Sequence, residues 1–295
     1  MGISDQIKDT FKQGSTLIKL IYINVGVFLF IKVMQVLAFL FGFSGISDLL
    51  LQWLAVPADL PRLLTRPWTL FTYMFLHEGF IHILFNLLWL YVFGRIFLMY
   101  LSEKRLTSVY LVGGLSGAVL YILAFNIFPA FQQAVPMSIA LGASASVMAI
   151  VIAISVYVPN FSINLLLIGP VKLKYIAIFT IVLDVLSIPS SNSGGHIAHL
   201  GGALFGYLYI SQYRKGRNIT RGFDRFMDRV FAMFKPKPRF RVTHKRPGTD
   251  IEYNKWRAER QKRIDEILEK ISQNGYESLT KEEKEILFKQ GGDKK

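Results

Sequence analysis

Three strongly apolar stretches of the sequence carry polar residues of types that can do chemistry. The first contains His82 and Asn86, which are four residues apart and therefore share one face of a helix. The second contains Ser144 in a run of small residues, and the third contains His199. A hydroxyl nucleophile, an imidazole base and donors for an oxyanion are the groups that acyl transfer requires. If the fold brings them together, they predict an acyl-transfer site.

Each of these residues has a rival or a simpler interpretation. A serine in a membrane helix usually bonds back to a carbonyl one turn earlier, and a histidine near a helix end is often interfacial. Ser146 is a second candidate nucleophile, but it lies about 200° around a helix from Ser144. His196 is a second candidate base. His77 and Asp184 are interpreted as structural or interfacial.

The composition indicates what kind of protein holds these groups in place. Of 295 residues, 52% are hydrophobic and only 18% are charged, and the mean hydropathy is +0.37. A soluble domain carries about 25% charged residues. The chain has no cysteine, which excludes a disulfide-stapled secreted scaffold. These values exclude a soluble globular enzyme and predict an all-α, multi-pass membrane protein.

Six apolar segments are long enough to cross a bilayer, some of them only with tilt or irregular ends. They lie at 17–43, 71–93, 106–128, 137–158, 173–188 and 196–213. A polar N-terminus, 1–16, precedes them without the apolar core of a signal peptide. The long first loop, 44–70, contains an amphipathic piece that predicts an interfacial helix.

The charges of the loops predict the orientation. The connections at 129–135 and 189–195 contain no Lys or Arg, whereas most of the other flanks are basic. Both termini are therefore expected in the cytoplasm, and the serine and the histidines in the outer half of the bilayer. Glycine pairs spaced four residues apart in the third and sixth segments predict close helix packing.

The spacing of these residues resembles the rhomboid family of intramembrane serine proteases. The similarity covers about 62–213 and consists of an HxxxN motif, a GxS motif and an HxxGxxxG motif. The matching residues are His82 and Asn86, then Gly142, Ala143 and Ser144, then His199, Gly202 and Gly206.

The resemblance implies a six-span bundle and a Ser–His dyad with no third carboxylate. In it Ser144 is the nucleophile, His199 the general base and acid, and His82 and Asn86 stabilise the oxyanion. It also implies substrates that are transmembrane proteins cut in or near their membrane segments. Neither a metal nor a cofactor is implied. Ala145 replaces the glycine that the family commonly has after the serine.

A second departure concerns the first loop, where the family often has a Trp-Arg pair and this chain has Thr69 after Trp68. Arg66 is a candidate replacement for the arginine. Two other functions stay open from the sequence. One is an inactive rhomboid-like protein that binds membrane clients, and the other is a small transporter.

The sequence after the last apolar segment is strongly basic, with 12 Lys or Arg and 2 Asp or Glu at 214–246. Directly beside a membrane, anionic lipids are the expected partner rather than nucleic acid. We predict a basic linker at 214–262 and a helical hairpin at 263–295, with Thr280 and Glu283 as a capping box. The hairpin is a candidate site for an unknown protein partner. The short loops favour a bacterial cytoplasmic membrane.

Overall fold

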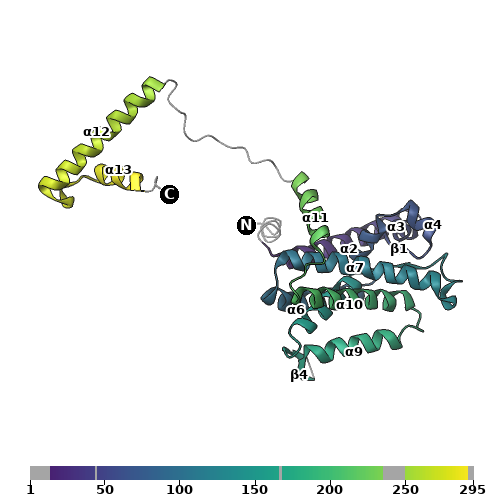
Figure 1. The fold of residues 1–295 in the computed structure, drawn as a ribbon. Coiled ribbons are helices and arrows are strands. Elements are labelled where there is room, and N and C mark those ends of the chain that lie inside the picture. The colour runs from purple at the N-terminus through teal and green to yellow at the C-terminus, as the bar shows by residue number, and fades with distance from the viewer. Residues whose placement is uncertain (1–13, 44, 166–167, 235–249, 292–295) are drawn as a thin grey trace. The chain divides into compact units, whose positions relative to one another are not determined.

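The computed structural model describes residues 14–43, 45–165, 168–234 and 250–291, and the chain is mostly helical (Figure 1). It divides into two compact units, Met1–Phe234 and Lys235–Lys295. Most of the predicted N-terminal segment 1–16, and the part of the basic linker at 235–249, lie outside the described residues.

Six helices make up the body of the first unit. They are α2 (Thr16–Leu40), α6 (Phe80–Tyr100), α7 (Glu103–Ile127), α8 (Ser144–Tyr157), α9 (Leu173–Leu186) and α10 (Ser193–Arg214). Within the described residues, α2, α6 and α7 are long and apolar enough to cross a membrane. The chain is therefore a membrane protein. At about 1.5 Å per residue, the 14-residue helices α8 and α9 are shorter than a bilayer core of about 30 Å.

The second apolar segment, 71–93, is interrupted before its long helix begins. Instead of one helix from residue 71, the chain forms the short helices α5 (Thr69–Thr72) and η1 (Tyr73–Phe75) before α6. The backbone is extended at Leu76 and again at Gly79, the residue before α6, which breaks the helical hydrogen bonding. His82 is thus the third residue of its helix, close to the helix start.

The first connection folds onto the segment that precedes α8. It contains α3 (Ile46–Leu54), the predicted amphipathic helix, and α4 (Leu60–Thr65). Between them, β1 (Val56–Pro57) pairs antiparallel with β2 (Ile139–Ala140). This short sheet fixes where the chain enters α8.

Aromatic and cationic side chains hold the end of the first connection against α3. Trp68 stacks on Trp53 with ring centroids 5.8 Å apart and donates its indole N–H to the Trp53 carbonyl at 2.8 Å. The Arg66 guanidinium lies 4.5 Å from the Trp53 ring and donates to the carbonyl of Gln52. Thr69 donates its hydroxyl to the carbonyl of Arg66. Arg66 therefore ties this loop to α3, although a threonine follows Trp68.

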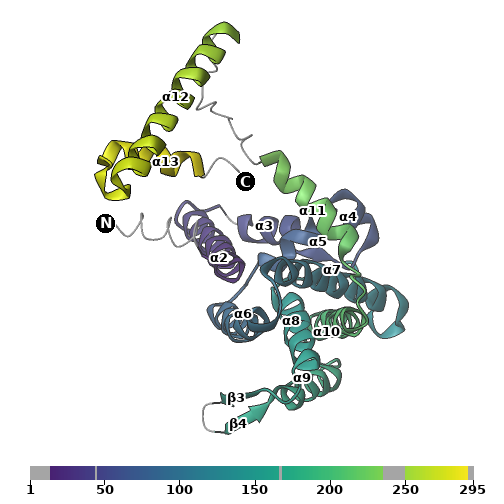
Figure 2. The ribbon, with the colours of Figure 1, turned by 60° about the vertical axis from the view of Figure 1, so that its left-hand side comes forward.

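Helix α8 occupies the centre of the first unit and packs against α6, α7, α9 and α10 (Figure 2). Its close approach to α10 depends on glycine. A Cβ on Gly202 would overlap the carbonyl oxygen of Ala145, and one on Gly206 would overlap that of Ala149. The close packing that the glycine spacing predicted in the sixth segment is confirmed.

The ends of several helices are joined by polar contacts. Arg214, the last residue of α10, donates to the carbonyls of Val156 and Tyr157 at the end of α8. Lys104, near the start of α7, pairs at 2.6 Å with Asp228 of α11 (Arg221–Phe234). The hairpin of β3 (Ser162–Leu165) and β4 (Gly169–Lys172) joins α8 to α9, and η2 (Pro129–Phe131) follows α7.

The second unit is a helical hairpin of α12 (Asp250–Asn274), η3 (Tyr276–Ser278) and α13 (Lys281–Gly291). Helix α12 begins at Asp250, earlier than the predicted hairpin at 263–295. The predicted capping box is confirmed: Thr280 N–H donates to Glu283, and Glu283 N–H donates to the Thr280 hydroxyl. The Thr280 N–H and the Lys270 ammonium hold the pKa of Glu283 below its usual range.

Candidate active site

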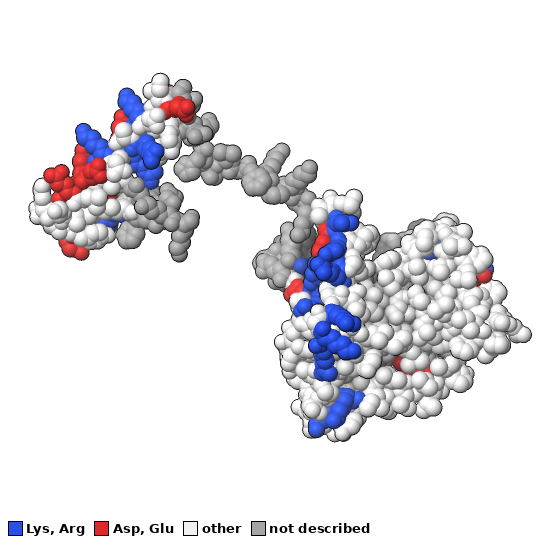
Figure 3. Space-filling model, viewed as in Figure 1, with Lys and Arg blue, Asp and Glu red and all other residues white. Residues whose placement is uncertain are grey.

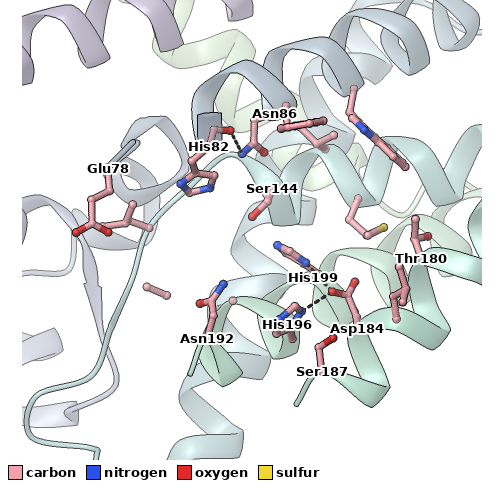
Figure 4. Close-up of a pocket in the computed structure, with 18 of the residues that line it drawn as sticks. Glu78, His82, Asn86, Ser144, Thr180, Asp184, Ser187, Asn192, His196 and His199 are labelled. Atoms are coloured by element: carbon pink, nitrogen blue, oxygen red, sulfur yellow. Dashed lines mark hydrogen bonds and ion pairs between the residues drawn. The ribbon is translucent and has the colours of Figure 1, made fainter. Parts of the chain in front are cut away.

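A pocket of about 740 Å³ opens between α6, α8, α9 and α10 (Figure 4). All four residues that the sequence singled out as catalytic line this pocket. Its polar lining is Glu78, His82, Asn86, Ser144, Thr180, Asp184, Ser187, Asn192, His196 and His199. The rest is largely apolar and includes Trp89, Val147 and Met148.

Ser144 is the first residue of α8 and is partly exposed to the pocket. The turn before it is made by Gly142, which has a φ of 130° and donates its N–H to the carbonyl of Tyr73 at 2.9 Å. Backbone N–H groups in the first turn of a helix have no partner within the helix, and the helix dipole is positive there. The N–H of Ser144 is therefore suited to bind a developing negative charge.

The side chains of His82 and Ser144 both approach the position that a Cβ on Gly142 would occupy. A Cβ on this glycine would lie 3.0 Å from His82 Nε2 and 3.5 Å from the Ser144 hydroxyl oxygen. The positive φ and this lack of space both require glycine at the position. Gly142 therefore leaves room between the imidazole and the hydroxyl.

Asn86 lies one turn beyond His82 on α6 and is buried. Its amide nitrogen donates to the carbonyl of His82 at 2.9 Å (Figure 4). An amide carries two N–H groups, and this bond occupies one of them. The second N–H remains a donor for a group bound in the pocket.

The neighbours of Ser144 on α8 face away from the pocket. Ser146 is fully buried, and its hydroxyl oxygen would lie 2.5 Å from a Cβ on Gly114 of α7. The methyl of Ala145 would lie 2.6 Å from a Cβ on Gly117 of the same helix. Ser146 is therefore poorly placed as a nucleophile. The methyl of Ala145 packs against α7 and not beside the Ser144 hydroxyl.

His199 and the Ser144 hydroxyl point toward one another across the pocket (Figure 4). The other side of the imidazole contacts Asp184 of α9: His199 Nδ1 lies 2.9 Å from Asp184 Oδ1. Nδ1 of His196 lies 2.8 Å from the same oxygen. The resemblance implied a dyad without a carboxylate, and Asp184 was interpreted as structural or interfacial. The structure instead places this carboxylate directly behind the candidate base.

Asp184, His196 and His199 also form a cluster of the type that can hold a metal ion, with ligand atoms within 4.8 Å of one another. In tetrahedral zinc sites, metal–ligand distances of about 2.0–2.1 Å separate neighbouring ligand atoms by about 3.3 Å. The separations of 2.8 and 2.9 Å from the carboxylate oxygen are instead typical of hydrogen bonds. The arrangement fits a carboxylate that accepts two imidazole N–H groups.

His77 lies outside the pocket lining. Its buried ring packs edge-on against that of His82, with centroids 5.1 Å apart. It is thus in a position to orient His82 by packing.

Comparison with known proteins identifies the membrane unit. Residues 64–215 match the family model described as the Rhomboid domain. Residues 249–289 match a second model, described as a family of unknown function (DUF6576), which covers the helical hairpin. The chain is similar to "RHOMBOID-like protein 12, mitochondrial" of Arabidopsis thaliana, with 32% identity over 161 residues. The match covers 52% of this chain and 48% of that protein, so the chain spans about half the length of the curated relative.

Proposed function

The chain belongs to the rhomboid family, and from this premise we propose that it is an intramembrane serine endopeptidase. It hydrolyses peptide bonds in or near the transmembrane segments of other membrane proteins. The observation that carries the proposal is that Ser144, His199, His82 and Asn86, from three separate helices, line one pocket.

In the proposed reaction the Ser144 oxygen attacks the carbonyl carbon of the scissile bond, and its proton passes to Nε2 of His199. His82, Asn86 and the N–H of Ser144 donate to the resulting oxyanion. His199 then protonates the leaving amine. A water molecule, deprotonated by the same imidazole, releases the acyl group from Ser144.

We also propose that α2, α6, α7, α8, α9 and α10 all cross the membrane, with both termini in the cytoplasm. Lys and Arg gather in a band at one edge of the first unit (Figure 3). Arg214 contacts the last residues of α8, whereas Ser144 is at the opposite end of that helix. By the positive-inside rule this arrangement supports a catalytic pocket near the outer face.

A transmembrane substrate would enter the pocket beside α9. This helix packs on α8 and α10 and exposes large apolar side chains, including Phe179 and Leu186. A helical substrate hides its carbonyls in hydrogen bonds, so a segment that contains Gly or other helix breakers should be cut best. We propose that α9 moves to admit it.

The basic segment 214–246 is our proposed contact with anionic lipid, and we propose no nucleic-acid partner. Among its described residues, Arg225 and Arg229 of α11 lie near the exposed apolar side chains of Phe226 and Met233. Basic and apolar residues together are typical of helices at a membrane surface. The hairpin stays a candidate site for a protein partner. The short loops of the first unit support a bacterial cytoplasmic membrane as the location.

The experiment that tests the function uses the full chain in liposomes and a transmembrane substrate with a glycine-containing segment. We expect the wild type to cleave it and Ser144→Ala to lower the rate by about 10³-fold or more. Ser146→Ala is the matched control, because it removes a hydroxyl two residues away that faces α7, and it should retain cleavage.

Two results would contradict the assignment. Cleavage that survives Ser144→Ala but is lost in Ser146→Ala would show that Ser146, and not Ser144, is the nucleophile. Failure of the wild type to cleave any of a panel of helix-destabilised segments, together with stable binding of them, would favour the inactive client-binding alternative.

A further inference from the structure

The carboxylate of Asp184 contacts the candidate base on the side away from the candidate nucleophile (Figure 4). We propose that Asp184 is a positioning residue, which orients His199 for proton transfer and stabilises the imidazolium that forms. The inference rests on the proposed protease function. It adds a third member to the pair that the family resemblance implied.

The hydrogen bond determines which nitrogen of His199 can act as the base. A carboxylate only accepts hydrogen bonds, so Nδ1 must carry the proton that it shares with Asp184 Oδ1 at 2.9 Å. In the neutral ring Nε2 is then the unprotonated nitrogen. The imidazole points toward Ser144 in Figure 4, so this tautomer turns the basic nitrogen toward the hydroxyl. Without the carboxylate, either tautomer and either ring orientation becomes available.

Burial strengthens the electrostatic effect of this carboxylate. The Asp184 side chain is only 8% exposed, and those of the two histidines are about one-fifth exposed. When His199 takes a proton from Ser144, a positive charge forms beside a fixed negative one in a poorly solvated site. Such an interaction is worth more there than in water, and it requires no rearrangement during the reaction.

His196 of α10 holds the carboxylate of Asp184 on α9 in place beside His199. It lies three residues before His199 on α10 and bonds the same oxygen of Asp184 at 2.8 Å. Two imidazole donors from α10 thus fix one carboxylate from α9. His196 anchors Asp184, while His199 alone of the pair points toward Ser144 in Figure 4.

The test compares Asp184→Asn with the wild type in the full chain, using both substrate cleavage and the rate of labelling by a fluorophosphonate. In labelling, the Ser144 oxygen bonds to phosphorus, fluoride leaves, and His199 takes the hydroxyl proton, so the rate reports the activation of the serine without any substrate. We expect kcat and the labelling rate to fall together by about 10²-fold or more, while KM changes less than about threefold. Asp184→Glu keeps the charge and should recover part of the loss.

The matched control is Asp224→Asn, which removes a carboxylate that bonds Ser108 and Asn218 and is not part of the pocket lining. It should leave kcat and labelling close to wild type. Asp184→Asn with unchanged kcat and labelling would overturn the inference, and so would a higher KM with unchanged kcat. A wild type that neither cleaves nor reacts at Ser144 would contradict the proposed function, and this inference with it.

Discussion

At the scale of single residues, the proposed catalytic effect of Asn86 can be measured separately from its effect on stability. Asn86 uses one N–H to bond the carbonyl of His82, and the residue lines a pocket that also contains Ser144. We expect Asn86→Ala to lower kcat by about 10²–10³-fold, because it removes the proposed oxyanion donor. KM should change little. Steady-state cleavage of the glycine-containing substrate measures both constants.

A second asparagine provides the control for this prediction. Asn24 of α2 makes the same bond, from its amide to the carbonyl four residues earlier, and is also buried. Asn24→Ala should lower the thermal unfolding temperature but leave kcat near wild type. An equal loss of kcat in both variants would show that Asn86 acts only through stability.

The residue after the candidate nucleophile shows how packing decides the effect of a substitution. Ala145 departs from the glycine that the family commonly has, and a methyl beside the serine hydroxyl would disturb the oxyanion site. Its Cβ instead faces Gly117 of α7, and the residue is buried. The methyl thus fills space between two helices and leaves the pocket unobstructed.

At the scale of the elements, the position of the candidate base, His199, depends on how closely α10 approaches α8. A Cβ on Gly202 would overlap the backbone of Ala145, which is the residue after the candidate nucleophile. We expect Gly202→Ala to push the helices apart, with a cost of about 1–3 kcal/mol in stability. Cleavage should fall by at least about tenfold, because small misplacements of reacting groups are costly. Thermal unfolding and cleavage rates measure the two effects.

Gly26 of α2 is the matched control for this substitution. It also lies within a long helix, but nothing lies within 4 Å of an added Cβ, and the residue is exposed. Gly26→Ala should leave activity unchanged and stabilise the helix by up to about 1 kcal/mol. If Gly202→Ala behaved in the same way, the close contact between α8 and α10 would not control the site.

At the scale of the whole molecule, the proposed topology places the two ends of α8 on opposite sides of the membrane. The chain has no native cysteine, so in a single-cysteine variant that is purified after labelling the introduced thiol is the one that reacts. In intact cells we expect a membrane-impermeant maleimide to label Gln133→Cys, in the loop before α8. Lys215→Cys, after α10, should react only when the membrane is permeabilised. Equal labelling of both without permeabilisation would contradict the six-span topology.

Much of the membrane unit follows from sequence patterns that act locally. The apolar segments determined that the chain is helical and membrane-embedded, and the four-residue spacing placed His82 and Asn86 on one face of α6. The Gly202–Gly206 pair predicted the close packing of α10. These properties depend on helix periodicity and side-chain size, which the order of residues specifies directly.

Other features were decided only when the helices packed together. The contact of Asp184 with His199 joins two helices and residues 15 apart, so no spacing rule predicts it. The one signal in the sequence was a carboxylate within an apolar segment, which needs a partner in a membrane. Similarly, the packing against α7 determined that Ser146 is buried, and the extended backbone before α6 determined where His82 lies. Each of these depends on how a neighbouring element is oriented, and that is a property of the tertiary structure alone.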